Sequence, residues 1–427
     1  MFFKKYFTFF RFLFYLHTVF LDIAFFICYN IPLVASVPIL RKGLRSMTNA
    51  HAKHHHANPI HSVTAFAKKN AVMMIALAAA VITSIIVPPD RQYLSYFDPK
   101  TLTCLFSVLA VVCALRNIHF FFVLARRIVA VFGNIRSSVT ALVYITFIGS
   151  MLIANDMALL TFLPLGYLVL TSTGKEKYMA FTFIMQNIAA NLGGMLTPFG
   201  NPQNLYLYSR FSIPTGEFMA VMALPFILSV ILITVCCLVF VKPEKIEVTD
   251  ETVHLPKGRC ALYLALFALA IAIVFRGIPY IIGLIVIPAV LIFADRKALA
   301  AVDYPLLFTF VFFFIFAGNM ARIDAVREIF SYLMDKSTLL FSVLSCQIIS
   351  NVPSAILLSR FTENWRELLV GVNIGGAGTL IASLASLITF REYTKHNPTG
   401  TGEYIKLFSL FNFGFLGILT VVMMIVM

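Results

Sequence analysis

The sequence predicts an all-α integral membrane protein with two inverted-topology repeats, each holding a re-entrant hairpin and a broken transmembrane helix. Three observations lead to this fold class. The 427-residue chain is 60% hydrophobic and 12% charged, with 43 phenylalanines, which is too little charge to cover a soluble domain. Several apolar runs approach the roughly 20 residues that cross a bilayer. A motif of the form Asn-x-Gly-Gly-x-x-Thr occurs at residues 191–197 and again at residues 373–379.

The net charge of +14 does not indicate nucleic-acid binding. Most lysines and arginines lie between the apolar runs, where they orient a membrane protein and meet anionic lipid. We therefore expect membrane lipid as a partner and a multi-pass location in the plasma membrane, which is the inner membrane in bacteria. The seven cysteines show no disulfide or metal spacing, and we interpret them as packing residues.

The first repeat is expected at residues 67–241. Its elements, in order, are spans over 71–87 and 102–115, a basic interfacial helix over 116–136, an apolar stretch over 137–170, a broken helix over 178–209 and a span over 217–241. The apolar stretch has Asn155-Asp156 at its middle. It is either one long span or two half-length helices that meet at a polar tip. Arg136 precedes the stretch and Lys175 follows it, so both ends can lie on the same, positively charged side of the membrane. This favours two helices that meet at a polar tip over one long span.

A polar linker and connecting helix are expected at residues 242–278, and the second repeat at residues 279–427. The second repeat follows the same order, with spans at 280–293 and 304–318, an amphipathic helix at 322–336, a hairpin at 339–360, a broken helix at 366–390 and a span at 405–427. The second hairpin carries Ser350-Asn351 at its centre. Counting crossings from a cytoplasmic Lys68-Lys69 places the halves in opposite orientations, with about 10–12 membrane segments in all.

Residues 1–66 stand outside this duplication as an N-terminal extension. The aromatic segment at residues 2–28 is an extra span, an interfacial anchor or part of an overlong gene prediction. In the last case Met47 is a candidate start residue. A signal sequence is disfavoured, because no small-residue cleavage site follows. Histidines cluster at residues 51–61. Metal binding is one interpretation of this tract, and a solvated linker is the preferred one.

The two hairpin tips carry the polar residues with the greatest functional interest. Helices that meet inside the bilayer expose backbone groups, which must be buried in protein or line a water-filled cavity. Their N-termini can bind an anion and carbonyl oxygens can coordinate a cation. A single Asn in a membrane helix can instead serve only to bond a neighbouring helix. Because Asn155 and Asn351 occupy matching positions, we favour a functional role for both, with Ser350 beside the second.

Asp156 gives the most specific functional hypothesis of any single residue, because it is the only carboxylate between Arg136 and Glu176. A carboxylate at membrane depth must be protonated, paired or bound to a cation. The alternatives are that Asp156 carries the coupling proton or Na⁺, or that it caps the second half-helix of the hairpin. Both roles can hold together.

The broken helices add a row of amides and hydroxyls. The glycine pairs alone are explained by close helix packing. In the first copy, however, Thr197, Asn201, Gln203 and Asn204 follow the glycines. In the second copy Thr379, Ser383 and Ser386 follow. Such neutral groups suit a small, partly dehydrated solute.

Three strings in the chain resemble the ion transporter superfamily, which includes citrate and dicarboxylate/sodium symporters, arsenite permeases and certain Na⁺/H⁺ antiporters. They are Ile-Ala-Asn-Asp-Met-Ala-Leu-Leu at residues 153–160 with Pro164, Gly-Gly-Met-Leu-Thr-Pro-Phe-Gly-Asn-Pro-Gln-Asn at residues 193–204, and Ile-Ser-Asn-Val-Pro-Ser-Ala-Ile-Leu-Leu at residues 349–358. The resemblance covers about residues 67–427. It implies an inverted repeat, two re-entrant hairpins, a homodimer and an elevator-type movement of a transport domain.

The chain departs from the dicarboxylate branch of this superfamily, in which each tip carries Ser-Asn-Thr. Here the tips are Ala154-Asn155-Asp156 and Ser350-Asn351-Val352. Only the two asparagines and Ser350 carry over, and the Asn-Asp tip looks more like the arsenite permease branch.

We therefore expect a secondary active transporter of a small anion or organic acid, coupled to Na⁺ or H⁺. The expected substrate-binding residues are Asn155, Thr197, Asn201, Asn204, Ser350, Asn351 and Thr379. The expected coupling residues are Asn155, Asp156, Gly200 and Asn351, of which Asn155 and Asn351 would be ligands of Na⁺. No organic cofactor is expected.

Three alternatives remain open at this stage. They are an arsenite or oxyanion efflux permease, a Na⁺/H⁺ antiporter and, less favoured, an ion channel. An enzyme is not expected, because no nucleophile–base or metal constellation lies at the breaks and the chain has no P-loop.

Overall fold

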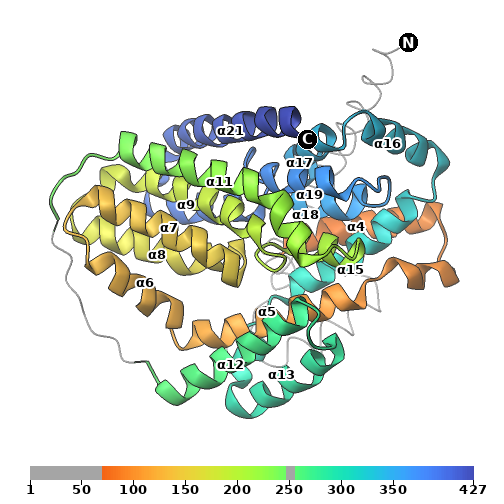
Figure 1. Cartoon of the computed structure of the whole chain (residues 1–427), viewed down its shortest axis with the longest axis horizontal. Coiled ribbons are helices and arrows are strands. Elements are labelled where there is room, and N and C mark those ends of the chain that lie inside the picture. The colour runs from red at the N-terminus through yellow and green to blue at the C-terminus, as the bar shows by residue number, and fades with distance from the viewer. Residues whose placement is uncertain (1–69, 247–254) are drawn as a thin grey trace, which may run out of the picture. The chain divides into compact units, whose positions relative to one another are not determined.

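The structure, a computed structural model, describes residues 70–246 and 255–427 (Figure 1). In these ranges the chain forms helices and no strand, with one isolated antiparallel bridge between Asn134 and Lys245. The predicted all-α fold is confirmed. The predictions for residues 1–66, including the histidine tract, lie outside the described residues.

Five helical segments of the described chain are long and apolar enough to cross a membrane. They are α5 (Pro99–Asn117), α7 (Ile135–Ile153), α11 (Thr215–Phe240), α12 (Lys257–Val274) and the run Pro398–Val426, which comprises η4 (Pro398–Gly400) and α21 (Thr401–Val426). Shorter apolar helices are α4 (Ala71–Ile86), α13 (Tyr280–Ala294) and α17 (Thr338–Ile349). Exposed Leu, Ile, Val and Phe side chains along α11 and α21 suit contact with lipid. The chain is a multi-pass membrane protein.

The described helices fall into two compact units. The smaller contains α4, η1 (Arg91–Tyr96) and α15 (Tyr304–Met320); the larger contains Asp98–Asp303 and Arg327–Met427. Helix α16 (Asp324–Lys336) begins in the first and continues in the second. The units group helices by contact, whereas the predicted repeats group them by order in the sequence, so the two divisions differ.

Packing in the smaller unit joins α4 to α15. Asn319 donates from Nδ2 to Thr83 Oγ1 (3.3 Å) and to Ser84 Oγ (3.2 Å). Arg322 pairs with Asp90 at 2.7 Å, and this pairing holds the pKa of the Asp90 carboxyl below its usual range. Buried polar side chains in this unit therefore bond one another across the helices.

The apolar stretch at residues 137–170 folds as a hairpin. Its arms are α7 and α8 (Asn155–Ser172), and the turn is the single residue Ala154. Gln186 donates from Nε2 to Thr146 Oγ1 (3.0 Å) on one arm and to the Phe162 carbonyl (3.2 Å) on the other. Residues 146 and 162 are equally far from Ala154 in sequence, so the arms run antiparallel. The tip prediction is confirmed, and the single long span is excluded.

The arms of this first hairpin are longer than expected. They contain 19 and 18 residues, which at about 1.5 Å per residue is close to a full bilayer crossing. Helix α7 starts at its cap Asn134, whose side chain accepts from Ser137 N, so it already includes the basic stretch around Arg136. The half-length expectation was wrong for this hairpin. Helices α7 and α8 extend only two residues beyond each end of the predicted stretch at 137–170, so that apolar stretch is itself long enough for two nearly full-length arms.

The second hairpin consists of α17 and α18 (Asn351–Leu358), with Ser350 as its turn. Ser345 Oγ and Ser354 Oγ lie 2.8 Å apart across the arms. At the open end, Thr338 Oγ1 and Thr362 Oγ1 lie 3.3 Å apart. These arms contain 12 and 8 residues and match the half-length expectation.

Both predicted broken helices are present. The first is α9 (Met179–Gly193), η3 (Gly194–Leu196) and α10 (Pro202–Arg210); the second is α19 (Trp365–Ile374) and α20 (Leu384–His396). Gly193 lies so close to the first hairpin that a Cβ on it would be 2.2 Å from the Phe147 carbonyl oxygen. In the second half, a Cβ on Gly375 would be 2.9 Å from Cys346 Cβ. Each break therefore packs on the first arm of the hairpin before it.

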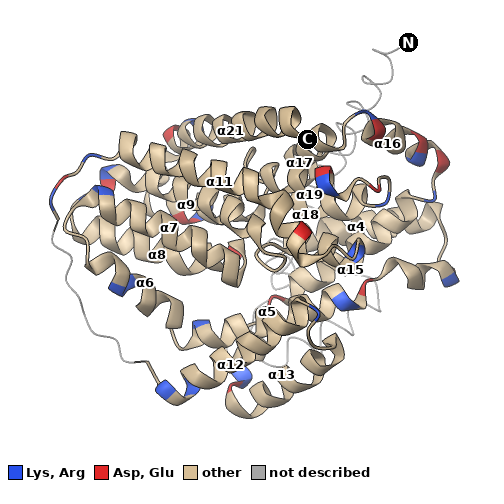
Figure 2. Cartoon of the chain, viewed as in Figure 1, with Lys and Arg blue, Asp and Glu red and all other residues tan. Residues whose placement is uncertain are grey.

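The remaining helices are short. The basic stretch at residues 116–136 was predicted as one interfacial helix. In the structure α5 ends at Asn117, α6 covers Phe120–Ala130 and α7 begins at Ile135, and η2 (Glu176–Tyr178) lies between α8 and α9. Helix α14 (Arg296–Ala300) was not predicted; it is a single turn capped by Asp295, whose Oδ1 accepts from Ala298 N at 3.1 Å. Figure 2 shows charged residues concentrated at helix ends and loops, as expected where apolar helix interiors meet lipid.

The start of the polar linker closes the base of the first hairpin. We call residues 241–246 the strap. Ile135 N donates to the Glu244 carbonyl at 2.9 Å, and Ile246 N donates to the Gly133 carbonyl at 3.2 Å. The Glu244 carboxylate accepts from Lys175 Nζ and Lys177 Nζ, each at 2.6 Å. These bonds, that of Lys175 first, lower the pKa of Glu244 to about 2.

Candidate functional site

The two hairpin tips have the same unusual backbone conformation. Ala154 has φ 67° and ψ 152°, and Ser350 has φ 74° and ψ 160°. Only glycine enters this region without strain, and other residues held there are enriched at functional sites. Asn155 and Asn351 follow these residues directly and begin the second arms, α8 and α18. The tips thus present matching asparagines at helix N-termini.

Each break bonds to the hairpin before it in an equivalent way. Thr197 donates from Oγ1 to the Met151 carbonyl at 2.8 Å. Thr379 donates from Oγ1 to the Gln347 carbonyl at 3.1 Å. Met151 and Gln347 lie equally far ahead of their tip asparagines. The final Thr of the doubled motif therefore has the same structural role in both halves.

A chain of buried amides joins the first tip to both breaks. Asn155 Nδ2 donates to Asn191 Oδ1 at 3.4 Å. Asn201 Nδ2 donates to the Asn191 carbonyl at 3.3 Å and to Asn373 Oδ1 at 3.1 Å. Asn373 Nδ2 in turn donates to Asn204 Oδ1 at 2.6 Å. We call these five residues the amide cluster; all are at most 3% exposed.

The second tip reaches the same place through Gly376. A Cβ on Gly376 would be 3.2 Å from Asn351 Nδ2 and 3.5 Å from Asn191 Oδ1. Glycine at this position therefore leaves room for both asparagine side chains. The structure brings Asn155, Asn201, Asn204 and Asn351 of the predicted site residues near one another.

Several acceptor oxygens around the cluster have no hydrogen-bond partner among the described residues. They are Oδ1 of Asn155, Asp156 and Asn201, and Oε1 of Gln203, and all four atoms are buried. A buried acceptor without a partner costs free energy. Carboxylate and amide oxygens are also the ligands that hard cations prefer. Each of these oxygens is therefore available to accept a hydrogen bond or to contact a small cation.

Asp156 does not occupy the cap of α8. The N-cap is Ala154, which has no side chain to cap with, and Asp156 is the second residue of the helix. A carboxylate in the first turn still gains from the partial positive charge of the helix N-terminus. The N-cap interpretation is replaced by a first-turn carboxylate beside the tip.

Other predicted residues have supporting positions. Asn204 Nδ2 donates to three carbonyls of the first break, those of Gly194 (3.1 Å), Met195 (3.2 Å) and Thr197 (3.2 Å). A Cβ on Gly200 would be 2.3 Å from the Gly194 carbonyl oxygen, so this glycine lets the two ends of the break approach closely.

The second tip is anchored to the second break. Ser350 Oγ donates to the Ala382 carbonyl at 3.2 Å, and the backbone N of Asn351 donates to the same oxygen at 2.9 Å. The Asn351 side chain meanwhile accepts from Val352 N at 2.9 Å. The Ser350 hydroxyl therefore bonds a backbone carbonyl in this conformation.

Several residues of the site were not predicted from the sequence. Asn191 and Asn373 open the doubled motif, and the motif itself was the signal that could have identified them. Asn187 bonds to Ser386 (3.3 Å) and Asn412 (3.4 Å). Arg116 donates to Met157 Sδ at 3.4 Å, which brings a guanidinium to the first turn of α8. No local pattern pointed to these last contacts.

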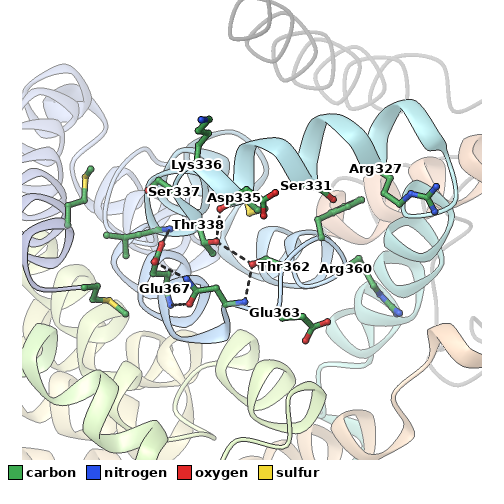
Figure 3. A pocket seen from close by; sticks show the side chains of 16 residues that line it. Arg327, Ser331, Asp335, Lys336, Ser337, Thr338, Arg360, Thr362, Glu363 and Glu367 are labelled. Carbon is green, nitrogen blue, oxygen red and sulfur yellow. Dashed lines mark hydrogen bonds between the residues drawn. The ribbon is translucent and has the colours of Figure 1, made fainter. Parts of the chain in front are cut away.

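A cavity of about 730 Å³ lies away from the tips, at the open end of the second hairpin (Figure 3). Its lining residues come from α16, the loop after α18, the start of α19 and the end of α21, and include Arg327, Lys336, Arg360, Glu363 and Met427. The labelled cationic side chains point in different directions in Figure 3. The cavity contains none of the predicted site residues.

Comparison with known proteins gives one family and two relatives. The family described as citrate transporter matches residues 63–364, a range that contains both hairpins and the first break. An uncharacterized transporter from Methanocaldococcus jannaschii is 34% identical over 322 residues, which cover 75% of this chain and 88% of that protein. The inner membrane protein YbiR of Escherichia coli is 30% identical over 285 residues, covering 64% and 74% respectively.

Proposed function

Because the chain belongs to the citrate transporter family, we propose that it moves a small anion or organic acid of the citrate or dicarboxylate type, coupled to Na⁺ or H⁺. Membership makes the chain a membrane transporter. The proposal of an anionic substrate with a coupling ion rests on the amide cluster. In this cluster, hydrogen bonds connect Asn155 at the first tip with Asn191 at the first break and Asn373 at the second.

The chemistry of this cluster supports an anionic substrate. Helices α8 and α18 both begin at the tips, so two helix N-termini are directed at the cluster, and their partial positive charge favours a carboxylate. The amide N–H groups of Asn155 and Asn351 supply further donors. An anion is thereby recognised without a lysine or arginine in the amide cluster itself.

Coupling is assigned to Asp156 and the acceptor oxygens beside it. An ionised Asp156 would repel an incoming carboxylate, and binding of a proton or Na⁺ would remove that repulsion. The Oδ1 atoms of Asn155 and Asn201 are buried and have no hydrogen-bond partner among the described residues, and in this proposal they share the cation with Asp156. Substrate and cation would therefore bind together, which is the requirement for symport.

The movement we propose is of the elevator type, in a homodimer in the plasma membrane. The hairpins and breaks are bonded to each other at several points. They are therefore suited to move as one transport body that carries the cluster across.

A second candidate function is efflux of arsenite or another oxyanion. The first tip, Ala154-Asn155-Asp156, favours it, since its third residue is a carboxylate where the dicarboxylate branch has a hydroxyl. Na⁺/H⁺ antiport would use the same carboxylate.

The deciding experiment is uptake into proteoliposomes that contain the full chain, with imposed Na⁺ or H⁺ gradients and a panel of citrate, succinate, sulfate and arsenite. We expect saturable uptake of citrate or succinate that depends on one gradient. Uptake of arsenite alone would support the second candidate. Flux of every solute without any gradient dependence would indicate a channel and refute both.

The variant Asp156→Asn tests the coupling assignment within the same assay. We expect it to keep binding the substrate and to lose the dependence of uptake on the Na⁺ or H⁺ gradient. An unchanged gradient dependence would remove Asp156 from the coupling site.

A further inference from the structure

Gln347, on the first arm of the second hairpin, holds the second break through its side chain. Its Nε2 donates to the Gly375 carbonyl at 2.8 Å and to the Val343 carbonyl at 3.0 Å. Its Oε1 accepts from the backbone N of Thr379 at 2.9 Å. One amide therefore bonds both the beginning and the end of the Gly-Gly-Ala-Gly-Thr turn.

The turn is wrapped closely around this amide. A Cβ on Gly378 would be 1.9 Å from Gln347 Oε1. A side chain at residue 378 would displace the Gln347 amide, whereas glycine leaves room for it. Gly378 is therefore required for the contact.

A broken helix leaves backbone groups without their usual helical partners, and burying them unpaired is costly. Asn204 lies in α10, the helix that follows the first break, and its side chain donates to three carbonyl oxygens of that break. In the second break, Gln347 supplies a donor and an acceptor from the hairpin. The two halves thus use different elements to satisfy equivalent breaks.

The position equivalent to Gln347 in the first hairpin is Met151, whose carbonyl accepts from Thr197 just as that of Gln347 accepts from Thr379. A methionine side chain has no amide to hold a break. The first tip is instead joined to its break by the bond from Asn155 to Asn191, which is 3.4 Å long. The second tip has two bonds of 3.2 and 2.9 Å to the Ala382 carbonyl.

We propose that Gln347 is a positioning residue that locks the second break to the second hairpin, so that Asn351 and the Gly375–Thr379 turn keep one fixed geometry while the first tip adapts to the ligand. The transport consequence of this lock rests on the function proposed above. The lock itself is a property of the folded chain and can be tested without a substrate.

The test of the lock is hydrogen–deuterium exchange of the purified full-length protein. In Gln347→Met, which introduces the side chain of the equivalent first-half position, exchange in residues 375–383 should rise about tenfold, as expected when two neutral hydrogen bonds are lost. Exchange in residues 194–201 should stay at the wild-type level. Unchanged exchange in residues 375–383 would overturn the proposal.

Two further variants sharpen this test. Gln186→Met removes a buried glutamine that bonds the arms of the first hairpin, and it should leave exchange in residues 375–383 unchanged; an equal rise there would mean that any buried Gln→Met change loosens the turn and would refute a specific lock. If Gln347→Met does not fold, Gln347→Glu is the second variant, and it keeps the acceptor for Thr379 N. Its carboxylate cannot donate to the Gly375 carbonyl, so exchange in residues 375–383 should still rise above the wild-type level. No rise would refute the lock.

Transport supplies the second readout. With [¹⁴C]citrate as the probe, Gln347→Met should raise KM about tenfold and change the maximal rate by less than about twofold, since a positioning residue acts on binding geometry. A lower maximal rate with unchanged KM would contradict the assigned role. If the wild-type protein moves neither citrate nor succinate, the proposed function fails, and the exchange measurement still decides the lock.

Discussion

The Nδ2 atom of Asn201 lies 3.1 Å from Oδ1 of Asn373 and donates to it, although the two residues are 172 positions apart. Asn201 ends the first break and Asn373 opens the second motif. The same Nδ2 atom also donates to the carbonyl of Asn191, which opens the first motif. This one side chain therefore links the two copies of the motif.

A double-mutant cycle on Asn201 and Asn373 should show strong coupling. We expect Asn201→Ala and Asn373→Ala each to destabilise the protein by about 1–3 kcal/mol, because each leaves buried polar partners unpaired. The double variant should cost less than the sum, with a coupling energy of about 0.5–1.5 kcal/mol. Denaturation in detergent measures all four proteins. Strict additivity would contradict a direct bond.

Removing either tip amide should disable transport and leave the fold intact. Asn155→Ala and Asn351→Ala should each lower the initial uptake rate by about 10- to 100-fold, which is the range expected for a lost hydrogen bond to a charged ligand. Membrane abundance should stay near wild type, and the thermal midpoint should fall no further than that of Asn201→Ala, because Asn155 makes a single 3.4 Å bond within the amide cluster. The measurement is uptake in proteoliposomes at matched protein content.

A matched control is Asn117→Ala, at the exposed end of α5, where the amide donates to Asp295 Oδ2 at 3.1 Å and to no other described residue. Its uptake rate should stay within about twofold of wild type, since exposed substitutions away from special features have small effects. Normal uptake by both tip variants would remove the tips from the site.

Close approach of backbones predicts a glycine requirement at the first break. In Gly193→Ala the new methyl group would lie 2.2 Å from the Phe147 carbonyl oxygen and 2.6 Å from Ser150 Oγ. We expect a loss of about 1–3 kcal/mol in unfolding free energy, as for other overpacked sites. Gly414→Ala in α21 is the control, because no heavy atom lies within 4 Å there. Equal stability of the two variants would show that α9 and α7 can separate at little cost.

The strap predicts a dependence of stability on pH. The pKa of Glu244 is lowered to about 2 from its ordinary 4.5, so its carboxylate stabilises the folded state above pH 4.5, and that contribution disappears as the pH falls towards 2. Glu244→Gln should therefore lower the thermal midpoint at pH 7, and the difference from wild type should shrink between pH 4.5 and pH 2.

The control for this series is Glu176→Gln, which removes a neighbouring exposed carboxylate and should have little effect at either end of the range. Thermal unfolding followed by circular dichroism provides the measurement. A difference between Glu244→Gln and wild type that persists undiminished near pH 2 would show that the strap acts through packing and not through its ion pairs.

Much of the fold was predictable because it depends on local properties of the chain. Apolar runs bounded by charge identify α5, α11 and α12, since a helix must pair its own backbone groups in lipid. Pro198 and Pro202 marked the first break for an equally local reason, because proline lacks a backbone donor and clashes with the preceding turn, and the glycine pair weakens the helix before them. The tip residues Asn155 and Asn351 stood out as polar groups in apolar surroundings.

Other features depended on contacts that sequence order does not encode. The role of Gln347 follows from the turn at residues 375–379 folding around its amide, and no spacing in the sequence indicates that. The same holds for Asn187 with Asn412 and for Arg116 with Met157. The length of the first hairpin's arms was also missed, although the arms extend only two residues beyond each end of the predicted apolar stretch at 137–170.

The sequence by itself determined that this protein is a helical membrane protein with two polar-tipped hairpins and two breaks, because burial of backbone in lipid restricts each segment separately. Only the tertiary structure decided that Asn191, Asn201 and Asn373 meet, and that Asn204 holds one break while Gln347 holds the other. Side-chain amides bond whatever groups the packing of helices brings within about 3 Å, and that packing is a property of the whole fold.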